Sequence, residues 1–220
     1  MPTPVSNPTS KSVHLSRTAI AILKVMVSDL TKEYTVRGLA ERIRQSYRIT
    51  YETAQKLAKD GHLELEKSGN HNVCTLNLSK DLQDLAFIES LRAEEFLEAK
   101  TDLRFLVSSI ISKISGVLPY FTLILFGSHV KGTAGTRSDL DIVLILAHRT
   151  FQRPFENELA SIARTSTTGL HELIVTSKEF ASMLSTKQGK GQPNVATETL
   201  ASHIIPYGAE AFYNLVSRLL

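Results

Sequence analysis

The stretch of sequence that decides the fold is Leu123-Ile-Leu-Phe-Gly-Ser-His-Val-Lys-Gly-Thr-Ala-Gly-Thr-Arg-Ser-Asp-Leu-Asp-Ile-Val-Leu-Ile-Leu146. It begins inside an almost wholly apolar run, Tyr120 to Phe126, which predicts a strand buried on both faces. Gly127-Ser128 ends this run sharply and exposes backbone N–H groups in a turn. A second run, Asp139 to Leu146, predicts another strand. The stretch therefore predicts a strand, a glycine-rich turn and a second strand.

Two aspartates, Asp139 and Asp141, open the second predicted strand. Because side chains alternate along a strand, both carboxylates are expected on one face, with Leu140 on the other. Carboxylates this close repel each other unless a cation lies between them. Mg²⁺ suits such a place because it combines a few carboxylates with phosphate oxygens. The alternative is that a plain Gly-Ser turn joins two core strands and that both aspartates are solvated.

The residues Phe126, Gly127, Ser128 and Asp139-Leu-Asp141 resemble the signature of the nucleotidyltransferase superfamily related to DNA polymerase beta. The sequence is more similar to the minimal nucleotidyltransferases, which read Gly-Ser-x-Ala-Arg-Gly and then Ser-Asp-x-Asp. Here Lys131 stands where those proteins usually have arginine, which keeps the charge but loses the planar guanidinium.

This resemblance implies an enzyme that moves a nucleotidyl group, AMP from ATP, onto a hydroxyl acceptor that the sequence does not identify. It implies two Mg²⁺ ions, which stabilise the entering and leaving oxygens when they lie about 3.5–4 Å apart. The residues that it implies for catalysis and metal binding are Asp139, Asp141 and Glu172. Those that it implies for nucleotide binding are Gly127, Ser128 and Lys131, with Ser138 and Arg137 as weaker candidates.

Glu172 is chosen because the family's third acidic residue lies on the strand beside the Asp-x-Asp strand. It is the only acid in the third predicted strand, Leu170 to Thr176. Many relatives have aspartate at this place, and some have no acid there, so an edge residue without a catalytic role is the alternative. Glu179, in the next predicted helix, is the other acidic candidate.

Length and composition predict two modest domains, since 220 residues with 42% hydrophobic residues can form sizeable cores. No apolar run approaches the roughly 20 residues of a membrane span, and the first residues do not resemble a signal peptide. We therefore expect a cytoplasmic protein. The single cysteine, Cys74, excludes an intramolecular disulfide and a cysteine-rich zinc site, and it is expected to be an ordinary strand residue.

The amino-terminal third predicts a disordered tail, residues 1–14, and then a small domain, residues 15–80, built from three helices and a hairpin. Hydroxyl side chains suited to capping precede each predicted helix. The predicted elements are the helix 16–30 capped by Ser16, the helix 36–45 capped by Thr35, the helix 51–59 capped by Thr50 and ended by Gly61, and the hairpin strands 62–66 and 72–78.

This order resembles the winged-helix domains of small prokaryotic and archaeal transcription regulators. In that resemblance the third helix reads the DNA major groove, and neighbouring basic residues contact phosphates. Residues 1–80 carry 12 Lys and Arg and 7 Asp and Glu, a formal charge of +5, whereas the rest of the chain carries −2. The alternative is that the domain docks on protein. The residues implied for nucleic-acid binding are Tyr51, Gln55, Lys56, Lys59, Arg44 and Arg48.

The remaining chain, residues 90–220, predicts the nucleotidyltransferase domain, with the boundary near residues 81–89. Its ending, Ile204 to Tyr213, resembles that of archaeal winged-helix nucleotidyltransferases. The expected fold class is α+β or α/β, a small mixed sheet with helices on one face joined to the winged helix. The helices predicted in this part are 94–115, 155–165, 178–184 and 196–202, with a loop at 189–194.

Three interpretations follow from the sequence. The first is an active nucleotidyltransferase whose winged helix targets or regulates it. The second is a DNA-binding regulator or an antitoxin that senses nucleotide or modifies a partner protein. The third is a scaffold with a decayed site, against which the intact Gly127-Ser128 and paired aspartates argue.

Overall fold

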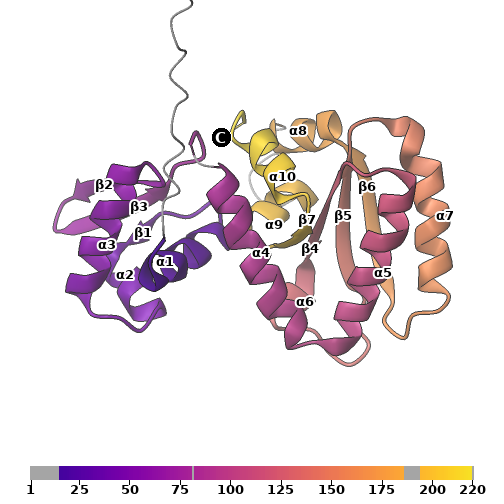
Figure 1. Ribbon diagram of the computed structural model, residues 1–220, viewed down its shortest axis with the longest axis horizontal. Helices are drawn as coiled ribbons and strands as arrows, with labels where there is room; N and C mark the ends of the chain where they lie inside the picture. The colour runs from indigo at the N-terminus through magenta and orange to yellow at the C-terminus, as the bar shows by residue number, and fades with distance from the viewer. Residues whose placement is uncertain (1–14, 81, 186–193, 220) are drawn as a thin grey trace, which may run out of the picture.

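The computed structural model describes residues 15–80, 82–185 and 194–219 (Figure 1). The tail predicted for residues 1–14 and most of the loop predicted at 189–194 lie outside the described residues. Within them the strands form a three-stranded sheet, in the order β1-β3-β2, and a four-stranded sheet, in the order β6-β5-β4-β7. This arrangement confirms the mixed α and β class. None of the helices in this part of the chain is long and apolar enough to cross a membrane.

The first three helices and the small sheet form the predicted winged helix. The hydroxyl of Ser16 accepts a hydrogen bond from the Ala19 N–H at the start of α1, and Thr35 does the same for Gly38 at the start of α2. Both predicted caps are thereby confirmed. The elements are α1 (Arg17–Val27), β1 (Tyr34–Thr35), α2 (Val36–Arg42), α3 (Tyr47–Asp60), β2 (Leu63–Ser68) and β3 (His71–Leu76).

The third helix starts earlier than predicted. The Ser46 hydroxyl accepts from the Ile49 N–H, and α3 begins at Tyr47, so Ser46 is the cap. Thr50, the predicted cap, lies buried in the first turn and donates its hydroxyl to the Ser46 carbonyl at 2.9 Å. Both residue types suit a cap, and the burial of Thr50 against the core decides between them. The helix ends at Gly61, in the left-handed conformation expected for glycine there.

The larger sheet is centred on two strands that are apolar except for Thr122 in one and Asp141 in the other. Its strands are β4 (Phe121–Phe126), β5 (Leu140–Leu146), β6 (Leu170–Thr176) and β7 (Ile204–Tyr207). β4 pairs antiparallel with β5 and with β7, while β5 and β6 are parallel. Every residue of β4 is buried, as its sequence predicts.

Helices cover both faces of this sheet, not one face as expected (Figure 1). Strand residues of both parities are apolar: Leu123 and Leu125 pack on one side, Ile124 and Phe126 on the other. Since each apolar face must leave water, each needs its own cover. One face is covered by α5 (Thr101–Val117) and α7 (Gln152–Ala163); the other is covered by α4 (Leu82–Glu98), α8 (Ser177–Ser185), α9 (Val195–Ala201) and α10 (Ala209–Val216).

The long helix predicted at 94–115 is two helices, α4 and α5, separated at residues 99 and 100. α4 packs against α1, α10 and β7, whereas α5 packs against α7. A single straight helix could not lie on both sides of the sheet, so the chain turns between them. The described part of the boundary predicted at 81–89, residues 82–89, lies in α4, and this helix joins the winged helix to the sheet in one core, with Leu23, Ile88 and Phe212 as members.

Candidate active site

The end of β4 brings Asp141 onto Gly127. Phe126, the last residue of β4, lies opposite Asp141 in β5, and α6 (Gly127–Lys131) starts directly after it. Gly127 has a φ of +72°, and a Cβ built on it would lie 2.0 Å from Asp141 Oδ2. Only glycine therefore permits both this backbone and the position of the carboxylate. The side chain of Asp141 is 23% exposed.

The Asp139 side chain packs against a second glycine, Gly169. Asp139 precedes β5 by one residue, so strand alternation does not determine its direction. A Cβ built on Gly169 would lie 1.8 Å from Asp139 Oδ1, and the Gly169 carbonyl accepts the Leu140 N–H at 2.8 Å. Asp139 is exposed, and its carboxylate has no hydrogen-bond or ion-pair partner within the described residues. Both carboxylates thus lie at one end of the sheet, in space left free because Gly127 and Gly169 have no side chain. Within the described residues, no Lys or Arg side chain binds either of them.

Two exposed or half-buried carboxylates suit a hard divalent cation. Mg²⁺ is commonly held by one or two carboxylates together with substrate phosphates and water. Within the described residues no group of three His, Cys, Asp or Glu side chains could hold a metal ion by itself. Asp139 and Asp141 therefore fit an ion that phosphate oxygens help to coordinate, and not an all-protein metal cage.

Glu172 is not brought to these aspartates. In the parallel pairing of β5 with β6, Asp141 aligns with His171, and Glu172 aligns with Ile142. Aligned residues of paired strands point to the same face, so Glu172 points away from the face of Asp141. The expected trio of Asp139, Asp141 and Glu172 is corrected by this register: Glu172 is an exposed residue of the edge strand.

His171 takes the place that was predicted for the third acid. Its Nδ1 lies 3.0 Å from Asp141 Oδ1, while 77% of its side chain is exposed. Glu179, the other acidic candidate, is bonded to Thr176 and Arg149 at the start of α8. Hydrogen bonds from the Thr176 backbone and the Arg149 side chain lower the pKa of Glu179 to about 2. Glu179 is thus held by local partners. Only the register of β5 against β6 shows that His171 lies beside Asp141, and the sequence does not determine that register.

The residues predicted for nucleotide binding lie on and after α6. Lys131, its last residue, forms an ion pair with Glu198 of α9, with 2.5 Å between Nζ and Oε1. The hydroxyl of Ser138 accepts the Gly135 N–H at 2.9 Å, so it shapes the loop before Asp139. Ser128 is half-buried, and its carbonyl accepts the Thr133 N–H at 3.0 Å.

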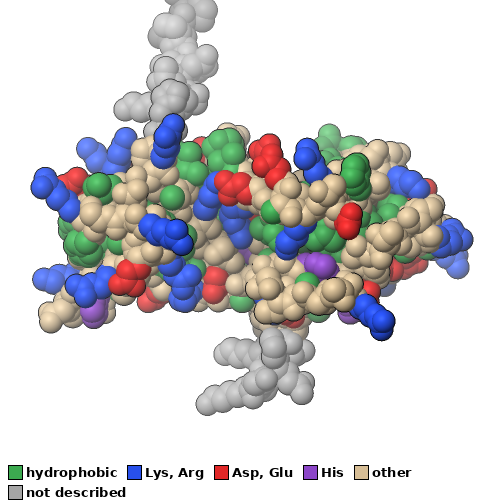
Figure 2. Space-filling view, turned by 90° about the horizontal axis from the view of Figure 1, so that it is seen from below, with side chains coloured by type: hydrophobic (Ala, Val, Ile, Leu, Met, Phe, Trp, Pro, Cys, Tyr) green, Lys and Arg blue, Asp and Glu red, His purple; other side chains and the backbone are tan. Residues whose placement is uncertain are grey.

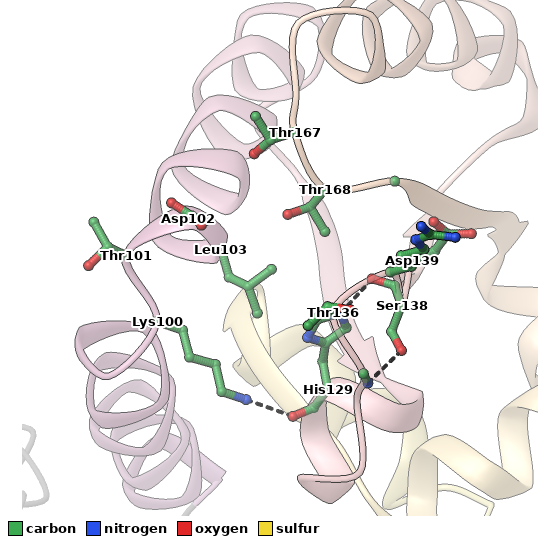
Figure 3. A pocket seen from close by; sticks show the side chains of 13 residues that line it. Lys100, Thr101, Asp102, Leu103, His129, Thr136, Ser138, Asp139, Thr167 and Thr168 are labelled. Atoms are coloured by element: carbon green, nitrogen blue, oxygen red, sulfur yellow. Dashed lines mark hydrogen bonds between the residues drawn. The ribbon is translucent and has the colours of Figure 1, made fainter.

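A cavity of about 700 Å³ opens beside Asp139 (Figure 3). Its walls are the residues at the start of α5, the loop 135–139 and the residues 167–169 before β6. Lys100 donates to the His129 carbonyl at 2.7 Å across one wall, and a nitrogen of the His129 ring lies 2.9 Å from the Ser138 carbonyl. Burial lowers the pKa of Lys100.

The residues predicted for nucleic-acid binding lie at the surface of the winged helix. Tyr51 is half-buried and stacks on Tyr47 with 6.0 Å between ring centroids. Arg48 donates to Glu52 at 2.8 Å, one turn along α3. The exposed members of the predicted set are Arg44, Arg48, Gln55, Lys56 and Lys59. Cys74 is buried in β3 as expected, and burial raises the pKa of its thiol to about 11.

A buried polar cluster that the sequence did not indicate centres on Glu89 of α4. Arg92 donates to both Glu89 oxygens at 2.6 and 2.8 Å, and Tyr213 donates at 3.0 Å. His203 lies 3.2 Å from Glu89 through Nε2 and 2.6 Å from the Thr199 carbonyl through Nδ1. Burial acts to raise the pKa of Glu89, but the charges of His203 and Arg92 hold it below its ordinary value. This cluster joins α4 to β7 and α10.

Comparison with known proteins gives one family match, and it covers the candidate site. Residues 107–188, which include β4, α6, β5 and β6, match the model of the nucleotidyltransferase domain. The sequence matches no curated protein.

Two solved structures align with 16% identity each. A crystal structure of Pseudomonas aeruginosa HmgR aligns over 60% of this chain and 47% of its own, with a TM-score of 0.25. TrmBL2, an archaeal chromatin protein with a novel mode of DNA binding, aligns over 77% of this chain and 68% of its own, with a TM-score of 0.24. The chain thus spans about half the length of the HmgR chain, and TM-scores this low carry no argument about fold or function.

Proposed function

We propose that this protein transfers AMP from ATP to a hydroxyl acceptor with Mg²⁺ bound at Asp139 and Asp141. The match of residues 107–188 to the nucleotidyltransferase domain model supports this proposal. The observation that carries the proposal is the seating of the two carboxylates on Gly127 and Gly169, where no Cβ could be accommodated. A fold that needed these aspartates only for solubility would not need that clearance. Their place at the end of the sheet, next to the glycine turn, suits a triphosphate that reaches both.

Different residues of the site would bind the metal ion and the phosphates of the nucleotide. Mg²⁺, when bound, neutralises charge on the phosphate oxygens of the nucleotide. Asp139 and Asp141 would hold it, and backbone N–H groups of the glycine turn would bind phosphate oxygens. Lys131 would exchange its ion pair with Glu198 for a phosphate oxygen. Ser138 would keep the loop before Asp139 in place through Gly135.

The chemistry of the transfer needs few protein groups. The acceptor oxygen forms a bond to the α-phosphorus, the bond from that phosphorus to the bridging oxygen breaks, pyrophosphate leaves, and the hydroxyl proton passes to solvent. Since Glu172 lies on the other face, Asp139 and Asp141 are the two carboxylates among the described residues that would hold the metal. We therefore propose one ion held by protein carboxylates. A second ion, expected from the family, would depend on phosphate and water ligands.

The test is a transfer assay with ATP labelled at the α-phosphate and Mg²⁺. Wild type should release pyrophosphate and pass the label to an acceptor, whereas Asp139→Asn and Asp141→Asn should each lose this activity while keeping the wild-type melting temperature. Asp60→Asn, at the end of α3, is the matched control and should behave as wild type. Equal activity of all variants would remove the aspartates from the proposal.

A second candidate function, DNA binding by the winged helix, is favoured by the solvent face of α3. Arg48, Gln55 and Lys59 lie at helical spacing on that face and are exposed. Figure 2 shows Lys and Arg side chains gathered over the winged-helix part of the molecule. Such a surface suits phosphate contacts and could serve the regulator or antitoxin interpretation, with a partner protein as the acceptor of AMP.

Fluorescence anisotropy with duplex DNA tests this second function. Binding through phosphates should weaken steeply between 50 and 200 mM salt, on the order of tenfold or more, and Lys59→Ala should reduce the salt slope. Lys113→Ala, on α5, is a control at the other end of the molecule. Without measurable DNA binding at low salt, docking on protein becomes the role of the winged helix.

A further inference from the structure

The cavity beside Asp139 lies apart from the glycine turn that is proposed to receive the phosphates. Asp139 and His129 line it, but Gly127, Ser128 and Lys131 do not (Figure 3). Asp139 therefore stands between two spaces: the turn on one side and a cavity of about 700 Å³ on the other. This volume is in the range of pockets that hold small molecules. A second reactant bound in this cavity would approach Asp139 from the side opposite the glycine turn.

Hydroxyl side chains dominate the wall of this cavity. Ser138 uses its hydroxyl for Gly135, as described. The four threonine hydroxyls have no hydrogen-bond partner within the described residues, so they are free to bind a ligand. A hydroxyl both donates and accepts, and it pairs best with other hydroxyl groups. The residues concerned are Thr101, Thr136, Thr167 and Thr168.

The rest of the lining argues against a nucleobase or a nucleic-acid strand. Among the described lining residues there is no Phe or Tyr, and Leu103 is the one larger apolar side chain, so the imidazole of His129 is the one ring that a base could stack on. Asp102 adds a carboxylate that is not assigned to the metal, which repels backbone phosphates but accepts hydrogen bonds from the hydroxyls of a ligand. Lys100 is committed to the His129 carbonyl, which leaves Arg137 as the exposed cation of the lining.

We propose that this cavity is the acceptor subsite of the enzyme and that it takes a small polyhydroxylated molecule of the sugar type. The inference rests on the proposed function and names the acceptor class that it left open. One hydroxyl oxygen of the sugar forms the bond to the α-phosphorus of ATP, pyrophosphate leaves with the oxygen that bridged it, and the hydroxyl proton is released to solvent. The products are a nucleotidyl sugar and pyrophosphate.

The experiment uses the full chain, Mg²⁺ and ATP labelled at the α-phosphate, with D-glucose, D-glucosamine and myo-inositol as probes. Saturation-transfer NMR measures binding of each probe without ATP, and nucleotide binding is titrated separately. Thr136→Val/Thr168→Val removes two hydroxyls and keeps the side-chain shape. Thr150→Val, outside the cavity, is the matched control.

We expect wild type to bind and to label at least one probe. The double variant should lower both signals roughly tenfold while its affinity for ATP stays within about twofold of wild type, since two hydrogen bonds to the probe are lost. If the double variant loses ATP affinity equally, the cavity holds the nucleotide and the proposal is wrong. Labelling of an RNA end or of a protein, with none of the probes bound, also overturns it. If wild type binds no ATP but still binds a probe, the sugar site stands and the proposed transferase function fails.

Discussion

The carboxylate of Glu89 differs from those of Asp139 and Asp141 in both burial and bonding. Glu89 is fully buried and is bonded to Arg92, His203 and Tyr213. The two aspartates are half-buried or exposed, and within the described residues His171 is the only side chain bonded to either of them. The buried charge is matched inside the chain. The carboxylates of Asp139 and Asp141 lie against Gly127 and Gly169, and within the described residues neither has a Lys or Arg partner.

This difference indicates that Glu89 serves the stability of the fold, whereas Asp139 and Asp141 are placed to bind a ligand. A buried carboxylate without partners would be expensive, so the fold supplies guanidinium, imidazole and phenol groups around Glu89. The two ring nitrogens of His203 lie against the Thr199 carbonyl and Glu89 Oε1. At Asp139 and Asp141 the fold supplies glycine clearance and, beside Asp141, the exposed ring of His171. That space suits a cation and a phosphate brought from solution.

The largest expected effect is on stability, from Glu89→Gln. The substitution removes the negative charge and leaves the Arg92 side chain, 10% exposed, without its counter-charge. Breaking a buried pair from one side costs about 3 kcal/mol or more, so the free energy of unfolding in urea should fall by that amount. Glu94→Gln, exposed on the same helix, should change it by less than about 0.5 kcal/mol. Equal losses for both variants would contradict the account of the buried cluster.

The next largest expected effect is on the rate of nucleotidyl transfer, in a comparison of Gly127→Ala with Gly132→Ala. Both glycines have positive φ, +72° and +73°, so both variants share the backbone strain. Only at Gly127 would the added Cβ meet Asp141; nothing lies within 4 Å of one at Gly132. We expect nucleotidyl transfer to fall on the order of a hundredfold more in Gly127→Ala, because the metal-binding carboxylate is displaced. Equal rates in the two variants would show that Asp141 is not needed where it lies.

The buried cluster should also make the free energy of unfolding depend on pH. The charges of His203 and Arg92, acting against burial, hold the pKa of folded Glu89 below its ordinary value. A lowered carboxyl pKa contributes stability above the unfolded value, about 4.3, and this contribution is lost as pH falls further. Urea unfolding between pH 7 and 3 should show a steeper loss for wild type than for Glu89→Gln. Parallel curves would mean that Glu89 does not carry this dependence.

The smallest effect concerns Lys131, the member of the open site that does have an ion pair. Glu198→Gln would release Lys131 for phosphate, and ATP affinity should rise by up to about fivefold, since a partly exposed pair is worth no more than about 1 kcal/mol. Glu210→Gln, on α10, is the control. Weaker ATP binding in Glu198→Gln would mean that Glu198 supports the nucleotide site and does not compete for Lys131.

The sequence predicted what depends on neighbouring residues. The strand, the glycine turn and the second strand follow from one continuous stretch, and the antiparallel return of β5 beside β4 brings Asp141 to Gly127. The caps of α1 and α2 follow from single hydroxyl residues. The third helix was placed late because Ser46 and Thr50 both suit a cap, and only burial separates them.

What depends on distant pairing could not be predicted. A shift of one residue in the register of β6 exchanges the faces of His171 and Glu172, and nothing in the sequence fixes that register. Glu89 and His203 are separated by 114 positions, so no local pattern announces their contact. The break between α4 and α5 likewise follows from the sheet having two apolar faces to cover, while residues 94–115 alone read as one helix.

The most direct test of the central claim is the equilibrium binding of labelled ATP to wild type and to Asp139→Asn/Asp141→Asn, with Mg²⁺ and with a chelator. The account predicts that wild type binds ATP with Mg²⁺ and at least about a hundredfold more weakly with the chelator. It predicts equally weak binding by the double variant in both conditions, with an unchanged melting temperature. Binding by wild type that ignores the chelator, or a double variant that binds as wild type does, would contradict the claim that these two carboxylates form a metal-dependent nucleotide site.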